Sequence, residues 1–203
     1  VAILAAVIMV IAIILLACAL PFVVSNYRVF QFTMVLITSI ALLGLNLLTG
    51  FNGQISLGHG AFYAMGAYCT AILIDHFGCP YPIAIVASGV LCMGLGWLFG
   101  LPALRLEGLY LALATFALGV CLPQILKYKG IEEWTGGVQG ITLIKPEAPF
   151  GLPLSADQWL YFFSLGFLLL LMWGAHNLIN SHTGGAITAI RDNPLAAAAM
   201  GID

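Results

Sequence analysis

Charged residues are scarce in this sequence. Its 203 residues include six lysines or arginines and eight aspartates or glutamates, 7% of the chain, whereas a soluble domain carries about 25%. Hydrophobic residues make up 62%, and the mean hydropathy is +1.09. A water-soluble enzyme or a disordered chain needs far more polar surface. The net charge of −2 provides no basic field for nucleic acid, so lipid is the expected solvent for most of the chain.

Motifs for metal binding, disulfide formation and nucleotide hydrolysis are also missing. None of the five cysteines belongs to a C-x-x-C pair, so the sequence predicts neither a zinc site nor a disulfide framework. Most of them lie in apolar runs, where cysteine is a small packing residue. The G-x-x-x-x-G-K-[ST] loop that binds ATP does not occur either. We therefore expect no catalytic residue, no metal and no cofactor in the chain itself.

The few charges leave long apolar runs between them. A helix needs about 20 apolar residues to cross a hydrocarbon layer about 30 Å thick. Most runs fit one crossing, but Val29–Ile74 is 46 residues long, about 69 Å as a helix, and suits two crossings or one crossing with a re-entrant piece. The six expected spans are Val1–Val24, Phe32–Thr49, Leu57–Ile74, Ile83–Leu101, Leu109–Leu126 and Trp159–Asn180.

These spans are expected to be helices. Strands of a membrane barrel alternate polar and apolar residues, whereas Ile11–Leu16 and Phe167–Met172 are apolar at every position. The fold class expected is all-α, a polytopic membrane protein with about six transmembrane helices in a single domain over residues 1–203. Because the first residue, Val1, is not an initiator methionine, we expect the chain to be a fragment.

A glycine-rich polar segment, Thr49–Gly60 (TGFNGQISLGHG), interrupts the longest run and contains a turn-forming Asn-Gly pair. Irregular backbone at membrane depth requires protein or a water-filled cavity around it, and transporters use broken helices there to hold substrate carboxylates. A helix beginning near Ser56 would point its N–H groups and positive dipole end at this place. The candidate residues of a substrate path are Asn52, Gln54, Ser56 and His59. The alternative is a helical hairpin turn at the surface, with Ser56 as a cap and His59 as a packing residue.

Half of the charged residues lie between Lys127 and Asp157, in a segment that also contains glycines and prolines. Residues 127–158 are expected to form a structured polar loop on one side of the membrane, either a solvated connection or a docking surface. The positive-inside rule favours a cytoplasmic location for this loop by a margin of only one basic residue, because three lysines lie here and Arg105 and Arg191 lie on the other side. The count does not fix the orientation.

The last segment, residues 181–203, is polar enough to lie outside the bilayer. Asn193 is a suitable helix cap and Pro194 fits the first helical position, while Gly201 is a natural stop. The sequence therefore predicts a helix of about two turns over Leu195–Met200, with Asp192 near its positive end. Its alanines suit docking in a groove, although an interfacial connector to another span is the alternative.

Four sequence blocks in order resemble those of branched-chain amino acid ABC transporter permeases of the LivM type. The blocks are Gly44–Tyr68 (GLNLLTGFNGQISLGHGAFYAMGAY), Leu101–Thr115 (LPALRLEGLYLALAT), Thr135–Ile141 (TGGVQGI) and Ala189–Asp203 (AIRDNPLAAAAMGID). The resemblance covers the chain from about Phe32 to its end. The family often has an acidic residue in the alanine run, where this chain has Ala198 or a neighbouring alanine, and its members continue with further spans.

The resemblance implies a permease subunit of an ABC importer that moves leucine, isoleucine and valine across the bacterial inner membrane. It implies that residues 127–158 are periplasmic and that residues 181–203 are a cytoplasmic coupling segment. The coupling residues are then Arg191, Asp192, Asn193, Pro194, Ala197, Ala198 and Gly201. The implied partners are ATP-binding subunits that bind and hydrolyse the ATP, a second homologous permease subunit, a periplasmic substrate-binding protein and membrane lipid, with no nucleic acid.

Three other functions stay open at this stage. A related ABC permease for urea or short amides shares most of these motifs. A passive channel or an ion-coupled carrier would need no ATPase partner, although the scarcity of intramembrane Asp and Glu disfavours proton coupling. A purely structural membrane subunit is disfavoured by the polar break.

Overall fold

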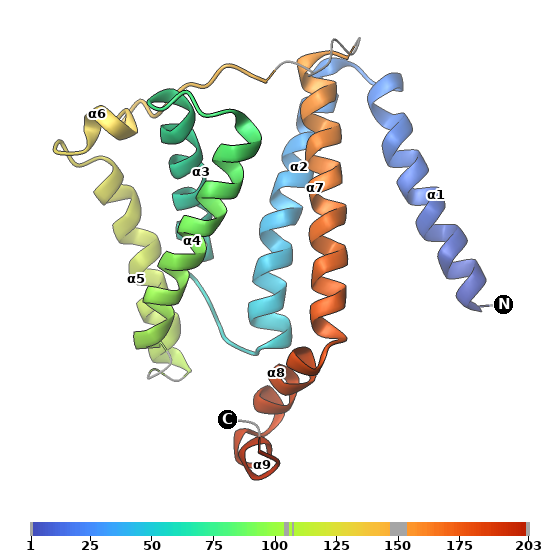
Figure 1. The fold of residues 1–203 in the computed structure, drawn as a ribbon, viewed down its shortest axis with the longest axis vertical. Helices are drawn as coiled ribbons and strands as arrows, with labels where there is room; N and C mark the ends of the chain where they lie inside the picture. The colour runs from blue at the N-terminus through green and yellow to red at the C-terminus, as the bar shows by residue number, and fades with distance from the viewer. Residues whose placement is uncertain (1, 104–105, 107, 147–153, 202–203) are drawn as a thin grey trace. The chain divides into compact units, whose positions relative to one another are not determined.

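The computed structural model of the chain describes residues 2–103, 106, 108–146 and 154–201. Helices account for all of the regular secondary structure in these residues, which confirms the predicted all-α class. The chain divides into two compact units, Val1–Leu43 with Lys145–Asn177 and Gly44–Ile144 with Leu178–Asp203. Figure 1 shows the order of the helices. The single domain expected over residues 1–203 stays a prediction.

The first unit is built from α1 (Ala2–Val23), most of α2 (Asn26–Asn46) and most of α7 (Ala156–Ile179). Val29 of α2 and Tyr161 and Leu165 of α7 form its buried core. Apolar residues of α1, among them Cys18, pack against this core. The three helices are therefore held together by side chains from each of them.

A proline in α1 is compensated by α7. Pro21 has no N–H, so the carbonyl oxygen of Ala17 loses its partner within the helix. The hydroxyl of Tyr161 donates to this oxygen at 2.9 Å, and the amide nitrogen of Gln158 donates to the carbonyl of Pro21 at 3.0 Å. Because lipid offers no hydrogen bonds, such partners must come from the protein.

The second unit holds the remaining helices and the polar break. Its elements are the end of α2, the π-helical turn η1 (Leu47–Phe51), α3 (His59–Asp75), α4 (Tyr81–Ala103), α5 (Leu109–Leu126), α6 (Glu132–Thr135), α8 (His182–Asp192) and α9 (Pro194–Ala199). Helix α3 packs against both α4 and α5. Between α3 and α4, the Thr70 hydroxyl donates to the Ser88 hydroxyl at 2.7 Å, a bond typical of helix pairs in lipid.

Four of the helices are long and apolar enough to cross a membrane by length and composition. They are Asn26–Phe51, Tyr81–Pro102, Leu109–Leu126 and Ala156–Ile179. Helices also occupy the other two expected positions, as α1 and as the 17-residue α3. Large apolar side chains such as Trp97 and Trp173, exposed to 70% and 69%, fit a lipid surface. The chain is a multi-pass membrane protein.

The predicted helix start near Ser56 is wrong. Helix α3 begins at His59, and its N-cap is Gly58, so Ser56 does not cap it. The physical reason is a contact with α5, because the N–H of Leu57 donates to the hydroxyl of Thr115 at 3.1 Å. This bond, made to a residue far along the chain, positions the segment before Gly58 on α5.

The polar loop has its own fold where it is described. Helix α6 lies against the end of α3, where the ring of Trp134 contacts the ring of His76 with centroids 4.9 Å apart. The hydroxyl of Thr135 donates to the carbonyl of Leu126 at 2.7 Å and so ties α6 to the end of α5. Residues 147–153 of the loop, and Arg105 of the expected opposite side, lie outside the described residues.

Candidate functional site

The polar break begins with a widened helical turn. In η1 the N–H of Asn52 donates to the carbonyl of Leu47 at 3.2 Å, five residues back. The N–H of Gln54 then reaches the carbonyl of Leu48, also at 3.2 Å. Between them Gly53 has a φ of +72°, which glycine adopts without steric cost. Turns of this π type often occur at functional sites.

The break ends in a close backbone contact with α5. Gly58 is buried, and a Cβ atom added to it would lie 2.3 Å from the carbonyl oxygen of Thr115. Gly119, one turn further along α5, faces the same stretch, with the carbonyl oxygen of Leu57 3.5 Å from its own added Cβ. Glycine at position 58 therefore allows the break to lie directly on α5.

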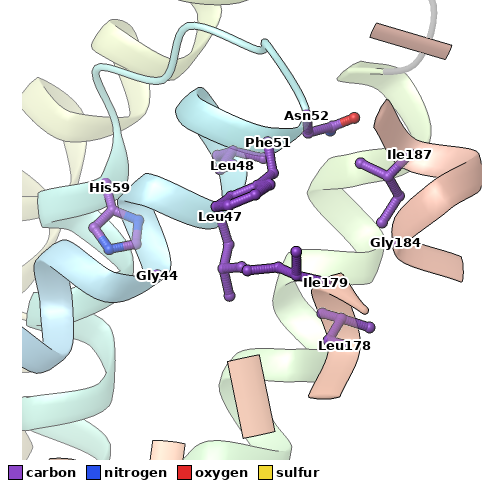
Figure 2. Close-up of a pocket in the computed structure, with 10 residues that line it drawn as sticks. All are labelled: Gly44, Leu47, Leu48, Phe51, Asn52, His59, Leu178, Ile179, Gly184 and Ile187. Atoms are coloured by element: carbon purple, nitrogen blue, oxygen red, sulfur yellow. The ribbon is translucent and has the colours of Figure 1, made fainter. Parts of the chain in front are cut away.

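A cavity of about 400 Å³ lies on one side of the break (Figure 2). Asn52 and His59 are its polar side chains, and the His59 ring lies beside Gly44, where an added Cβ would be 3.3 Å from the imidazole Cε1. The other lining residues are Leu47, Leu48, Phe51, Leu178, Ile179, Gly184 and Ile187. The cavity thus lies between the break and the segment that leads from α7 into α8.

A second cavity, of about 620 Å³, contains the other two candidate residues. Gln54, Ser56 and Thr115 supply its polar side chains. Most of its other walls are apolar and come from η1, from α3 to α5 and from nearby loops: Leu48, Ile55, Phe62, Gly96, Phe99, Gly100, Pro102, Leu106, Leu111, Ala114, Ala117, Leu118 and Cys121. Leu48 lines both cavities.

The structure therefore divides the four candidate residues into two pairs. Asn52 and His59 lie at the first cavity, and Gln54 and Ser56 at the second. A largely apolar cavity with a few amide and hydroxyl groups suits a ligand that has an aliphatic part and a polar part. Among the described residues no cluster of His, Cys, Asp and Glu is suited to a metal ion. The roles of the four residues in binding stay predictions.

Sequence reasoning missed Thr115. This residue combines a hydrogen bond to the break with a place in the wall of the second cavity. Thr115 is the last residue of the Leu101–Thr115 block, and this position was the feature of the sequence that could have indicated it. The sequence did not reveal the role of that block. A hydroxyl in an otherwise apolar helix is the kind of residue that satisfies irregular backbone in a membrane protein.

The tail has the predicted caps and one helix more than predicted. Asn193 caps α9 by accepting a hydrogen bond from the N–H of Ala196 at 3.1 Å, Pro194 is the first helical residue, and Gly201 follows the helix with a φ of +81°. These local expectations are confirmed. Helix α8, which precedes α9 and packs against it, was not expected from the sequence. Ser181 caps it by accepting from the N–H of Gly184 at 3.3 Å.

The exposed face of α9 differs from the expected one. Ala197 was expected on the docking surface, but its side chain is only 3% exposed. Leu195 and Met200 are 84% and 83% exposed, and Ala198 is exposed as well. The accessible surface of the short helix is therefore formed by these larger apolar side chains rather than by the methyl group of Ala197.

A hydrogen bond from Arg191 connects the tail to the break. The Nη1 atom of Arg191 donates to the carbonyl oxygen of Gly50 at 2.9 Å. Its Nε and Nη2 atoms both contact Asp192 Oδ1, at 2.9 Å and 2.8 Å. Arg191 was expected to contact a partner subunit, and its contact with Gly50 was not foreseen.

Comparison with known proteins gives consistent results. Residues 27–203 match the family described as branched-chain amino acid transport system / permease component. The chain is 32% identical over 215 residues to the high-affinity branched-chain amino acid transport system permease protein LivM of Escherichia coli (strain K12). This alignment covers 95% of this chain and 50% of that protein. It is 31% identical over 214 residues to the LivM protein of Salmonella typhimurium (strain LT2), covering 94% of this chain and 50% of the relative.

The chain thus spans about half the length of the curated relatives that it matches. No solved structure matches it.

Proposed function

Because the chain belongs to the family of permease components of branched-chain amino acid transport systems, we propose that it forms part of the membrane pathway of an ABC importer for leucine, isoleucine and valine. The observation that carries this proposal is the family match over residues 27–203. The chain supplies a pathway rather than a reaction, and ATP is bound and hydrolysed by partner subunits.

The polar break supports a substrate path in the second unit. The 620 Å³ cavity has the apolar walls that a branched aliphatic side chain requires. Gln54 and Ser56 offer an amide and a hydroxyl for the ammonium and carboxylate groups of an amino acid. Asn52 and His59 provide polar groups at the neighbouring 400 Å³ cavity and form a second binding position along the same path.

The tail, residues 181–203, is proposed as the coupling segment for an ATP-binding subunit. The described part of the tail consists mainly of the two short helices α8 and α9. Leu195, Ala198 and Met200, at α9 and its C-terminal end, are exposed to solvent. Exposed apolar side chains of this kind are suited to a groove on a partner. The proposal for Arg191, Asp192, Asn193, Pro194 and Gly201 is structural, since they cap, end or orient these helices.

The remaining parts of the importer follow from the same family. The proposed partners are ATP-binding subunits, a second homologous permease subunit and a periplasmic substrate-binding protein, and the proposed location is the bacterial inner membrane. In this proposal the tail is cytoplasmic and residues 127–158 are periplasmic. The order of the four sequence blocks supports this orientation over the charge count, which favours the opposite one by a single basic residue.

The test is uptake of leucine into vesicles that contain the full-length subunit with its partner subunits and binding protein. ATP-dependent uptake that excess isoleucine or valine blocks is the expected result. Urea uptake without leucine uptake would retain the importer and change its cargo, and uptake that is indifferent to ATP would contradict the proposal.

Variants of the second cavity test the path. Gln54→Ala and Ser56→Ala should lower leucine uptake about tenfold, because each removes one substrate hydrogen bond of about 1.5 kcal/mol. Ser39→Ala is the matched control, since Ser39 donates to the carbonyl of Val35 in its own helix and does not line either cavity. Membrane insertion should be equal in all three. Unchanged uptake in both cavity variants would remove Gln54 and Ser56 from the path.

A further inference from the structure

Arg191, in the last turn of α8, joins the tail to the polar break. Its Nη1 atom donates to the carbonyl oxygen of Gly50, 141 positions earlier in the chain, at 2.9 Å. We propose that Arg191 is a positioning residue that holds the polar break to the tail helices and passes their movement to the first cavity. The inference rests on the proposed function, because that function supplies the ATP-driven movement of the tail. The contact between Arg191 and Gly50 lies within the second unit.

The carbonyl of Gly50 is a suitable partner for a cation. It lies at the C-terminal end of the helix formed by α2 and η1, which ends at Phe51. The last carbonyls of a helix have no partner within the helix, and this end carries the negative side of the helix dipole. A guanidinium donor therefore makes a charge-assisted hydrogen bond at this position.

The aliphatic part of Arg191 packs on the same segment. A Cβ atom added to Gly53 would lie 2.6 Å from Arg191 Cγ and 3.2 Å from its Cδ. Because Gly53 also has a φ of +72°, this position favours glycine for both backbone and packing reasons. The arginine therefore contacts the break at two points, and Phe51 and Asn52 lie between them.

Asp192 fixes the orientation of the guanidinium. Its Oδ1 atom lies 2.9 Å from Nε and 2.8 Å from Nη2, which leaves Nη1 directed at Gly50. The side chain of Arg191 is 37% exposed, so solvent weakens the attraction of this pair. The geometry is still restrained because the planar guanidinium has a fixed arrangement of donors.

The first cavity is bounded by both sides of this contact. Phe51 and Asn52 contribute to it from the break, and Gly184 and Ile187 contribute from α8 (Figure 2). A displacement of α8 relative to the break therefore changes the cavity that holds Asn52 and His59. Arg191 forms a hydrogen bond between the two walls, so it favours their moving together.

The experiment is hydrogen exchange on the full-length subunit assembled with its partners, with and without ATP. The reporters are the amides of Asn52 and Gln54, which are bonded to Leu47 and Leu48 in the turn that Arg191 holds. We expect Arg191→Met to speed their exchange about tenfold without ATP, because the turn opens locally, and to abolish any further change with ATP. Arg191→Lys, which keeps a donor, should restore part of the protection.

Arg28→Met is the matched control. Arg28 is an exposed residue of α2 in the first unit, so the same chemical change there should leave exchange at Asn52 and Gln54 unaltered. Leucine uptake per ATP hydrolysed should fall in Arg191→Met and stay the same in Arg28→Met.

Four results would overturn the inference. The first is unchanged exchange at the reporters in Arg191→Met. The second is an effect of ATP on this exchange that survives the substitution, and the third is no effect of ATP in the unmodified protein. The fourth is release of the ATP-binding subunits by both Arg191→Met and Arg191→Lys, which would make Arg191 a docking contact. Failure of the proposed function is recognised separately, as absence of ATP-dependent leucine uptake by the unmodified complex.

Discussion

The substitution Gly58→Ala tests the close contact between the polar break and α5. The backbone of Gly58 has a φ of −96° and a ψ of 6°, values open to alanine, so any effect must come from the added methyl group. That Cβ would lie 2.3 Å from the carbonyl oxygen of Thr115, and backbone atoms have little freedom to yield. The break must then move away from α5 by about 1 Å to restore normal contact distances.

The cost has two parts. Forcing an extra methyl group into a packed site costs about 1–3 kcal/mol. A movement of about 1 Å also weakens the hydrogen bond from the Leu57 N–H to the Thr115 hydroxyl, a loss of about 1 kcal/mol. We therefore expect Gly58→Ala to destabilise the subunit by about 2–4 kcal/mol and to displace Ser56 and Gln54 from the second cavity.

Gly60→Ala is the matched control. Gly60 lies two residues further on, in the first turn of α3, and an added Cβ would meet nothing within 4 Å. Because alanine is the better helix former, this change should be neutral or stabilise by up to about 1 kcal/mol. The two substitutions make the same chemical change and have opposite expected signs.

The assay is the fraction of the complex that remains monodisperse after heating, together with leucine uptake at a permissive temperature. Gly58→Ala should lower both, and Gly60→Ala neither. Equal stability and equal uptake of the two variants would refute the argument that Gly58 lies against the backbone of α5.

Two further predictions concern the tail. Gly184→Ala should detach α8 from the end of α7 and lower ATP-coupled uptake at least tenfold, because the added Cβ would lie 2.2 Å from the Ile179 carbonyl oxygen. Gly185→Ala is the control and should leave uptake unchanged, because its added Cβ would meet nothing within 4 Å. Equal uptake by these two variants would contradict the close approach of Gly184 to the carbonyl of Ile179. Leu195→Asp should prevent recovery of the ATP-binding subunits with the purified permease, while Leu195→Met should allow it, since Leu195 is 84% exposed. Retention of the subunits by Leu195→Asp would exclude this face of α9 from docking.

The membrane class and the helix positions followed from the sequence because they depend on local properties. Long charge-free runs such as Leu109–Leu126 must hydrogen-bond internally in lipid, and a helix achieves this within one segment. The caps of α9 were predictable for the same reason, because Asn193, Pro194 and Gly201 act on their own neighbours. The glycine-rich polar interruption at Thr49–Gly60 indicated the polar break as the candidate site.

Contacts between distant segments were decided only by the tertiary structure. Asn52 and Ser56 are four residues apart in sequence, yet they line different cavities, because η1 positions the chain before Asn52 and the contact with α5 positions it after Ser56. The difference between Gly58 and Gly60 depends on where Thr115 lies, and the burial of Ala197 depends on how the tail folds.

The sequence by itself thus determined that this chain is an all-helical membrane protein with a polar break, since the lipid solvent restricts each segment separately. Only the tertiary structure decided which side chains share a cavity and that Arg191 reaches Gly50. The physical reason is that a hydrogen bond between residues 141 positions apart depends on the path of the whole intervening chain. The sequence close to Arg191 or to Gly50 therefore does not predict this hydrogen bond.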